Sequence, residues 1–469
     1  MGSRKSSSRK NPTDPGPLVP LDLRTTLFEL IGDEFPAFEK AMGQDPPTSI
    51  RLNAMKPFAL EAGSIPWCNT GRYLDTRPAF TFDPLFHTGA YYVQEASSMF
   101  LEQAVRASGL LDIDVLALDL CAAPGGKTTH LRSLLSPGSL LVANETDDHR
   151  RSALKENIWK WGAKNVVISG SDPRDLVRTP NAFELILVDA PCSGEGMFRK
   201  DRFARSQWNP GLVDRCTVVQ QSILAQAWRS LAPGGSLIYS TCTWEPQENE
   251  AQIRTLIDKG AECMDIPLDQ GWGIERSSLF GTIGYRFYPH CTNGEGFFLS
   301  MVRKPGELVL REEGSRQNDH EEVRNWLIDP TEQCFTEQEN ILYGIDAKWR
   351  NVTIDLQTAV RKLLPGIPVA QLKGNAWQPH PALALSVLLS PKAFQAMDLE
   401  RDAAIRYLRG EALSAQGASD VGLVSFQGLR MGWVQGAGNR WNNRWPTTWR
   451  IRTQQPLSLI HISEPTRPY

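Results

Sequence analysis

Several features of common protein classes are missing from this sequence of 469 residues. None of its eight cysteines belongs to a C-x-x-C pair, which argues against a zinc site or a disulfide framework and favours a reducing compartment. No apolar run approaches the length of a membrane span, and the first residues lack the apolar core of a signal peptide. A net charge of −3 excludes a strongly basic surface that would coat nucleic acid. We therefore expect a cytoplasmic protein without a membrane partner or a bound metal.

Two familiar phosphate-binding fingerprints are also missing, although one stretch comes close to them. Residues 118–127 read L-D-L-C-A-A-P-G-G-K. A phosphate loop would need Gly where Cys121 stands, and no G-x-G-x-x-G is present. An apolar strand, a turn of small residues and a helix start still suit a nucleoside without a pyrophosphate, such as S-adenosylmethionine. Taken alone, the stretch is equally consistent with a turn that only packs a strand against a helix.

Strand and helix patterns alternate from residue 116 onward, which predicts a mostly parallel sheet. The predicted strands are residues 115–120, 140–144, 166–169, 183–188 and 236–240, followed by an antiparallel pair at 286–290 and 296–302. Predicted helices include residues 147–161, 214–231 and 245–257, and the second of these carries an apolar stripe that includes Val219. Because the carboxyl ends of parallel strands share one edge, the loops after them should converge there. The residues expected at that edge are Gly125, Glu145, Asp172, Asp189, Cys192 and Cys242.

Two acidic residues at this edge suit contacts with a nucleoside. Glu145 ends the second strand, where a carboxylate can accept hydrogen bonds from ribose hydroxyls. It is equally suited to cap the next helix. Asp172 follows the third strand and is placed to meet a base edge.

Two cysteines and a carboxylate at the same edge suit a particular reaction. Taken singly, Cys192 and Cys242 would each be a small buried apolar residue. Together at one edge they suit alkylation of a pyrimidine at carbon 5, because a thiolate that adds to carbon 6 makes carbon 5 nucleophilic. A carboxylate such as Asp189 can hold the base and stabilise the charge that develops.

The regions on either side of the sheet differ from it in composition. Residues 1–20 are rich in Ser, Pro and basic residues and predict a disordered tail, which is either solvated or in contact with RNA phosphates. Residues 21–92 predict a small accessory domain. Residues 305–334 are charged and predict a linker.

The C-terminal part, residues 335–452, mixes short strands with turns and ends in several Arg and Trp residues. Arg444-Trp445 and Trp449-Arg450 are examples. Such neighbours suit stacked bases and phosphates, and they equally suit the core of a small β-domain. Residues 453–469 continue no pattern and are expected to be a non-native tail.

Three motifs together resemble the Nop/Sun family of RNA (cytosine-5)-methyltransferases. They are the stretch at 118–127, V-D-A-P-C-S-G at 188–194 and Y-S-T-C-T at 239–243, and their order and spacing are highly specific. Residues 49–53, 92–98 and 294–298 extend the resemblance. The G-N-R and R-W-P-T-T-W-R-I segments within 438–452 are similar to those of the bacterial small-subunit (16S) rRNA methyltransferase F group, whose tail is a PUA-like RNA-binding domain.

This resemblance implies an α/β fold with three parts. Residues 93–304 would form a Rossmann-like methyltransferase sheet, residues 21–92 an N-terminal accessory RNA-binding domain, and residues 335–452 a C-terminal PUA-like RNA-binding region. The implied cofactor is S-adenosylmethionine, and the implied partner is RNA, with small-subunit rRNA first. The implied cofactor contacts are Cys121, Ala122, Ala123, Pro124, Gly125, Gly126, Lys127, Glu145, Asp172 and Asp189.

The resemblance also assigns roles to the two cysteines. Cys242 would be the nucleophile, and Cys192 would act in release of the methylated RNA. DNA cytosine methyltransferases instead attack with the Pro-Cys position, which makes Cys192 the alternative nucleophile. A flipped base would enter between the cofactor and these cysteines. Tyr91, Phe198 and Trp244 are candidates to stack on that base, or else core residues.

Two other functions remain open at this stage, namely a tRNA cytosine-5 methyltransferase and a non-catalytic RNA-binding factor in ribosome assembly. Loss of Cys242, Asp189 or the Gly125-Gly126 pair would favour the second, but all four are present. The sequence does not determine the oligomeric state, and a monomer is compatible with it.

Overall fold

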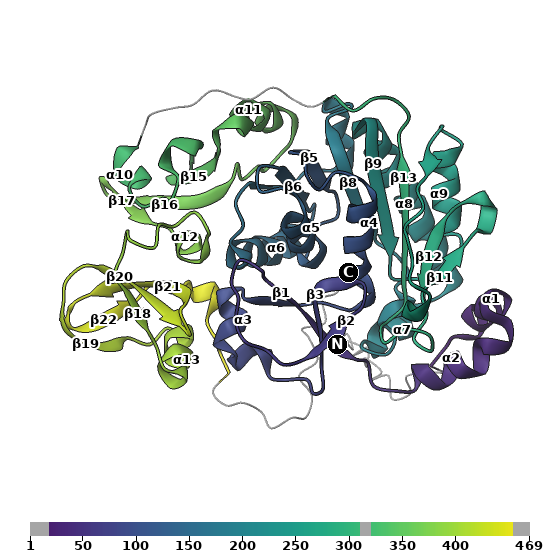
Figure 1. The fold of residues 1–469 in the computed structure, drawn as a ribbon, viewed down its shortest axis with the longest axis horizontal. Helices are drawn as coiled ribbons and strands as arrows, with labels where there is room; N and C mark the ends of the chain where they lie inside the picture. The colour runs from purple at the N-terminus through teal and green to yellow at the C-terminus, as the bar shows by residue number, and fades with distance from the viewer. Residues whose placement is uncertain (1–17, 310–319, 454–469) are drawn as a thin grey trace, which may run out of the picture.

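A nine-stranded sheet forms the centre of the computed structural model, which describes residues 18–309 and 320–453 (Figure 1). Its strand order is β11-β12-β13-β9-β8-β5-β6-β7, and β10 pairs with β13. The strands are β5 (Leu116–Asp119), β6 (Leu140–Asn144), β7 (Val166–Ser169), β8 (Phe183–Asp189), β9 (Leu231–Thr241), β10 (Glu262–Cys263), β11 (Glu275–Ser277), β12 (Gly284–Phe287) and β13 (Phe297–Arg303). β5 to β9 are parallel, and the later strands join antiparallel. The predicted parallel sheet with a final antiparallel pair is therefore confirmed.

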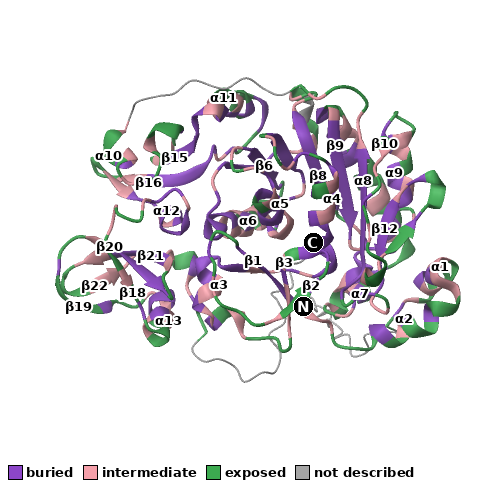
Figure 2. Cartoon of the chain, in the orientation of Figure 1, coloured by how far each residue is buried: buried purple, intermediate pink, exposed green. Residues whose placement is uncertain are grey.

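Helices pack on both faces of this sheet because its strands are apolar on both faces. Leu116 and Leu118 of β5 share a core with α8 (Pro210–Ser230) and α9 (Glu250–Ile257). Ala117 points to the other face and shares a core with α4 (Leu101–Ala107) and α5 (Gly126–Leu134). A further helix, α6 (Asp148–Trp161), joins β6 to β7. Figure 2 shows the central strands as buried and the outer faces of the flanking helices as exposed.

Two helix predictions differ from the structure. The predicted stripe on α8 is wrong at Val219, which is exposed, because the buried face runs through Val213, Gln220 and Ile223. The predicted helix at 245–257 begins only at Glu250. Asn249 has a non-helical backbone because its side chain bonds the Thr241 hydroxyl at 2.6 Å and the Thr243 carbonyl at 2.9 Å.

The N-terminal part consists of a helical pair and a small sheet. α1 (Leu21–Ile31), η1 (Gly32–Glu34) and α2 (Phe35–Met42) precede a four-stranded sheet of order β2-β3-β1-β4. Its elements are β1 (Thr48–Leu52), β2 (Gly63–Ile65), β3 (Cys68–Leu74) and β4 (Tyr91–Val93), with α3 (Pro84–Thr88) before β4. Arg51 on β1 is buried and donates to the Thr129 hydroxyl on α5 at 2.6 Å, which ties this sheet to the central one.

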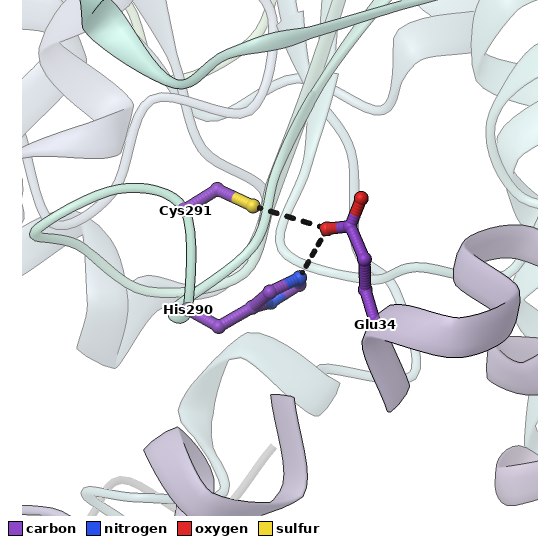
Figure 3. A group of neighbouring side chains, drawn as sticks. All are labelled: Glu34, His290 and Cys291. Carbon is purple, nitrogen blue, oxygen red and sulfur yellow. Dashed lines mark hydrogen bonds and ion pairs between the residues drawn. The ribbon is translucent and has the colours of Figure 1, made fainter. Parts of the chain in front are cut away.

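A polar contact ties the helical pair to the turn after β12. His290 Nε2 lies 2.9 Å from Glu34 Oε2, and the Cys291 thiol donates to the same oxygen at 3.6 Å. Figure 3 shows both side chains directed at the Glu34 carboxylate. Phe38 of α2 packs edge-on against the His290 ring at 5.8 Å between ring centroids.

The C-terminal part contains two separate sheets, although the sequence predicts one PUA-like region at 335–452. The first has the order β14-β15-β16-β17 and packs beside β7, where Leu364 pairs with Ile168. The Asp346 carboxylate accepts hydrogen bonds from Lys164 at 2.8 Å and Asn165 at 2.7 Å. The elements of this sheet are β14 (Gln333–Gln338), β15 (Ile341–Asp346), α11 (Arg350–Ala359), β16 (Ile367–Lys373), β17 (Ala376–Pro379) and α12 (Pro381–Leu385).

The second sheet has five strands in the order β18-β20-β21-β22-β19. Its elements are β18 (Ala396–Asp398), α13 (Arg401–Arg409), β19 (Leu413–Ala418), β20 (Val421–Phe426), β21 (Leu429–Gly436) and β22 (Gly438–Asn443). Trp433, Trp445 and Trp449 are buried in its core. The sequence left two roles open for these tryptophans, contact with RNA or packing in the core of a small β-domain. Their burial shows that they pack in the core.

The predicted tails and linker lie partly outside the described residues. Residues 1–17, 310–319 and 454–469 are not described. Val19, in the predicted tail, is buried against the helical pair, and Val323, in the predicted linker, is buried on the short helix α10 (Glu321–Arg324). None of the helices in the described residues has the length and apolar character needed to cross a membrane.

Candidate active site

The stretch at 118–127 forms the predicted strand, turn and helix start. β5 ends at Asp119, and Gly125 precedes α5 with a left-handed φ of 112°. A Cβ added at Gly125 would lie 3.3 Å from Leu154 Cδ1 and in a strained conformation, so the turn needs glycine. The Thr128 hydroxyl donates to Asp119 Oδ2 at 2.7 Å and fixes the helix start against the strand. Free N–H groups of the first turn of α5 remain available to a ligand at this edge.

Lys127 and Asp189 form an ion pair across the edge of the sheet. Lys127 Nζ lies 2.9 Å from Asp189 Oδ2, and Ser240 donates to Asp189 Oδ1 at 2.8 Å. Burial by itself lowers the pKa of Lys127, but the Asp189 charge outweighs burial and raises that pKa above its ordinary value. Lys127 therefore stays charged, and the partly exposed Asp189 carboxylate is held in one orientation.

Cys192 and Cys242 meet beside this ion pair. Their Sγ atoms are 3.3 Å apart, although the residues are on separate loops after β8 and β9. The backbone N–H of Cys242 also donates to Cys192 Sγ at 3.4 Å. The hydrogen bond with Cys242, then burial, raises the pKa of Cys192 well above its ordinary value. Cys192 is thus a protonated thiol near neutral pH, and Cys192 and Cys242 are both partly exposed residues.

Glu145 and Cys121 border the same edge. Glu145 is buried, and one carboxylate oxygen accepts the N–H of Asp147 at 2.9 Å. The cap of α6 is Asp147 itself, whose side chain accepts from the Arg150 N–H at 2.7 Å, so Glu145 is not the helix cap. Burial, followed by the charge of Asp119, raises the pKa of Cys121, which leaves its thiol neutral.

Asp172 is the predicted edge residue that turns toward its own loop. Arg174 donates to both of its oxygens, at 2.9 and 2.6 Å. These bonds lower the pKa of Asp172 to about 2. The carboxylate is ionised, and its hydrogen bonds in this structure are to Arg174.

The three aromatic residues predicted to stack on a base are buried. Tyr91, Phe198 and Trp244 are at most 4% exposed. Trp244 donates to the Phe287 carbonyl at 2.9 Å and packs against Phe38. Of the two roles that the sequence left open for these rings, the structure supports the core.

Residues that the sequence did not single out also contact the edge. Tyr92 lies beside the turn, and its hydroxyl donates to the Pro124 carbonyl at 3.3 Å. Glu195 and Glu248 form a buried carboxyl pair directly behind the cysteines, joined through Ser193. Their nearness to the P-C-S-G and T-C-T motifs is the only signal for them in the sequence.

Comparisons with family models match three parts of the chain. Residues 112–303 match 16S rRNA methyltransferase RsmB/F. Residues 19–96 match the N-terminal domain of 16S rRNA methyltransferase RsmF. Residues 394–451 match the methyltransferase RsmF PUA domain, which corresponds to the second C-terminal sheet.

Curated relatives carry the name ribosomal RNA small subunit methyltransferase F. The protein from Escherichia coli O9:H4 (strain HS) is 30% identical over 448 residues, which cover 85% of this chain and 89% of that protein. The protein from Aeromonas salmonicida (strain A449) is 37% identical over 274 residues, or 55% of this chain. That alignment spans only 57% of the length of the Aeromonas protein.

Solved structures share the fold of the central part. A methyltransferase homologue from Pyrococcus horikoshii has a TM-score of 0.50 and 28% identity, covering 59% of this chain and 92% of the other. NSun6 from the same organism, solved with the S-adenosylmethionine analogue SFG, has a TM-score of 0.52 and 22% identity. The alignment spans the whole of NSun6 and 62% of this chain. At 22% identity, this likeness shows the fold alone.

Proposed function

Because this chain belongs to the family of ribosomal RNA small subunit methyltransferase F, we propose that it methylates carbon 5 of a cytosine in small-subunit rRNA. The observation that carries this proposal is the 3.3 Å contact between Cys192 Sγ and Cys242 Sγ beside Asp189. Substitution at pyrimidine carbon 5 requires a thiol that can add to carbon 6 and a fixed carboxylate at the base edge, and the second thiol lies close enough to the first to take part in release.

The cofactor of this family is S-adenosylmethionine, and the residues at the edge fit it. The left-handed Gly125, the start of α5 and the buried Glu145 supply the close backbone approach, the N–H groups and the carboxylate that a nucleoside requires. The bound cofactor would supply the methyl group. We propose residues 121–127, Glu145, Asp172 and Asp189 as its contacts. For Asp172, contact requires the carboxylate to turn away from Arg174.

We propose that Cys242 is the nucleophile. Its thiolate would form a bond to carbon 6 of the cytosine, which makes carbon 5 electron-rich. Carbon 5 would then take the methyl group. A base would remove the proton from carbon 5, and the bond to Cys242 would break to restore the aromatic ring and the thiolate. Asp189, fixed by Lys127 and Ser240, would hold the base edge and stabilise charge there.

Cys192 suits the release step better than the attack. Its raised pKa disfavours its thiolate, and its sulfur lies against that of Cys242. A neutral thiol at this distance can exchange a proton as the adduct breaks down. The alternative, attack by Cys192, would require a thiol whose anion is disfavoured to be the nucleophile.

The accessory parts support a folded RNA as the substrate. A groove of about 930 Å³ lies between the N-terminal sheet and α13 of the PUA-like sheet. Phe58 and Phe80 line one side, and Arg401 and Arg406 line the other. Aromatic and arginine side chains suit bases and phosphates, respectively. We propose that residues 21–92 and 335–452 hold the RNA while residues 93–304 carry the chemistry.

The decisive experiment compares two alanine variants on rRNA and tRNA with labelled S-adenosylmethionine. Cys242→Ala is expected to lose methylation, whereas Cys192→Ala is expected to accumulate a covalent protein–RNA adduct visible on a denaturing gel. Bisulfite sequencing of RNA from cells with and without the gene then identifies the modified cytosine. An adduct with Cys242→Ala but not Cys192→Ala would reverse the assigned roles. Modification of tRNA alone would reject the rRNA substrate, and no change in any RNA would favour a non-catalytic factor.

A further inference from the structure

A buried pair of carboxyl groups lies behind the two cysteines, and the chemistry above does not use it. Glu195 is on the 3₁₀ helix η5 (Glu195–Met197), three residues after Cys192, and Glu248 is six residues after Cys242. Both side chains are completely buried. Ser193 lies between them and shares the loop of Cys192.

The hydrogen bonds around Ser193 require one proton more than its hydroxyl supplies. Ser193 Oγ lies 2.6 Å from Glu195 Oε1 and also within hydrogen-bond distance of Glu248 Oε1. A hydroxyl carries a single proton and can donate it to only one acceptor. The other contact therefore needs a proton that belongs to a carboxyl group. The pair therefore holds one acidic proton in the folded state.

Neutral groups supply the remaining hydrogen bonds. Gln220 on α8 donates to Glu248 Oε2 at 2.7 Å, and the Ser193 N–H donates to the same oxygen at 3.1 Å. The Trp244 N–H donates to Glu195 Oε2 at 3.2 Å, and the Trp208 indole donates to Glu195 Oε1. Two anions held in a buried site by neutral donors repel each other. Burial and the Glu195 charge accordingly raise the pKa of Glu248 to about 8.

The same contacts join the loops that carry the cysteines. The Gly196 N–H donates to the Cys242 carbonyl at 2.9 Å, and Ser193 bonds the Thr243 hydroxyl at 3.2 Å. Gln220 also donates to the Pro191 carbonyl at 2.9 Å. The carboxyl pair therefore closes a network whose opposite end is the contact between Cys192 and Cys242.

We propose that Glu195 and Glu248 are positioning residues that share one proton through Ser193 and thereby hold Cys192 against Cys242. Loss of that proton would leave two buried carboxylates on one hydroxyl, and their repulsion would separate the two loops. The inference rests on the proposed methylation only for its effect on activity. Its effect on stability is independent of any reaction.

Other titratable groups face the pair, and the raised pKa values of Cys192, Cys216 and Tyr239 keep those three neutral over the relevant pH range. They are Cys192, Cys216 on α8, Tyr239 on β9, and Cys242 and Glu245 on the loop after β9. Burial raises the pKa of Cys216 to about 12 and that of Tyr239 well above its ordinary value. Burial and then the Glu195 charge raise the pKa of Glu245 to about 7. Glu245 is therefore the neighbour whose titration must be separated from that of the pair.

The test replaces Glu248 with glutamine, which keeps the size and one acceptor but needs no shared proton. In the wild type, the folded state retains a proton that the unfolded state releases above the ordinary carboxyl pKa of about 4.3. The wild type should therefore lose stability relative to Glu248→Gln as pH rises from 4.3 to 8, and the difference should stop growing above pH 8. Thermal unfolding of both proteins between pH 4 and 9 measures this difference.

Methylation provides the second readout. Glu248→Gln should retain methylation at pH 7. The ratio of kcat/KM for the variant to that of the wild type should rise above pH 8, by up to about tenfold per pH unit. Glu245→Gln is the matched control, because it removes a buried carboxyl that does not bond Ser193. In this control, the fall in stability that Glu245 causes up to about pH 7 should be absent. The fall between pH 7 and 8 should remain.

Identical pH profiles for Glu248→Gln and the wild type, in both readouts, would overturn the shared proton. A folded Glu248→Gln that is inactive at every pH would overturn the positioning role. If Glu248→Gln does not fold, Glu195→Gln should give the same result, because either carboxyl can supply the proton. Failure of both variants to fold would contradict the proposal, since one amide can replace one protonated carboxyl. An inactive wild type with the expected stability profiles would reject the methylation and leave the shared proton intact.

Discussion

Two clusters of cysteine and acidic side chains among the described residues differ in access: one is sealed in the interior, and the other lies at the carboxyl edge of the parallel strands. In the sealed cluster, Cys68 Sγ lies 3.8 Å from His130 Nε2, which lies 3.7 Å from Glu102 Oε2. These three residues would fit a nucleophile, a base and an acid by type. All three are at most 2% exposed, and they come from β3, α5 and α4.

The proposed catalytic cluster at Cys192 and Cys242 differs in access and in position. Both cysteine residues are partly exposed and follow the carboxyl ends of β8 and β9, whereas the sealed cluster lies where β3, α4 and α5 meet. Burial raises the pKa of Cys68 to about 11 and lowers that of His130 to about 4, so both are neutral near pH 7. Residue types alone therefore do not identify a site. Position at the carboxyl edge of parallel strands does.

The largest expected difference between the clusters is in methylation after removal of a thiol. Cys242→Ala should lower kcat/KM by at least about 10⁴-fold, because the nucleophile is lost. Cys68→Ala should leave kcat/KM of the folded protein unchanged, because its sulfur is sealed from substrate. Methyl transfer from labelled cofactor, normalised to folded protein, measures both. A comparable loss in the Cys68 variant would mean that the sealed cluster takes part in the reaction.

Neutralising one carboxylate in each cluster should sharpen the contrast. Asp189→Asn should lower kcat by about 10²- to 10³-fold, since the charge held by Lys127 and Ser240 is removed from the reacting base. Glu102→Gln should instead lower the free energy of unfolding by about 1–3 kcal/mol, because it leaves buried donors without a charged acceptor. Steady-state kinetics and urea unfolding of both variants separate these effects. A stability loss without a rate loss in Asp189→Asn would make that residue structural.

Buried parallel strands were predictable because they are continuous apolar runs. The predicted strands at 140–144 and 166–169 have the bounds observed for β6 and β7. Once the strand ends were known, the loops that place Lys127 beside Asp189 and Cys192 beside Cys242 followed from parallel geometry. The site was thus predictable where it depends on backbone order.

Side-chain contacts that do not follow from the order of the strand ends were not predictable. Glu195 and Glu248 are far apart in the chain, and charged residues are usually exposed, so no local pattern indicates a buried pair. Neighbouring side chains of β4 face opposite sides of the strand. Tyr91 points into the core, and Tyr92 lies beside the turn at residues 121–127. The two C-terminal sheets have similar mixtures of strands and turns, which hides the boundary between them.

Part of the loss of stability at acid pH should come from the sealed cluster. Burial lowers the pKa of His130 to about 4, so the unfolded chain binds a proton on this residue at a higher pH than the folded chain does. The stability contributed by neutral His130 is present above pH 6.5 and is lost as pH falls toward 4, by roughly 3 kcal/mol in total. His130→Gln should lack this component. His87 and His380 are unchanged in both proteins, so the difference between the two urea-unfolding curves at each pH isolates His130.

The smallest effect is expected where the cluster residues are at the surface, at Glu34, His290 and Cys291. The Glu34 side chain is 65% exposed, so its contact with His290 is screened by water. Glu34→Gln keeps an acceptor for His290, and the packing of His290 on Phe38 is unaffected. The free energy of unfolding should therefore fall by less than about 1 kcal/mol, with most of the change lost in high salt. A loss above 2 kcal/mol that a chelator reproduces in the wild type would mean instead that a metal ion bridges the three side chains. The surface cluster would then be the one whose stability depends on a ligand, and the sealed cluster the one that is stable through its own contacts.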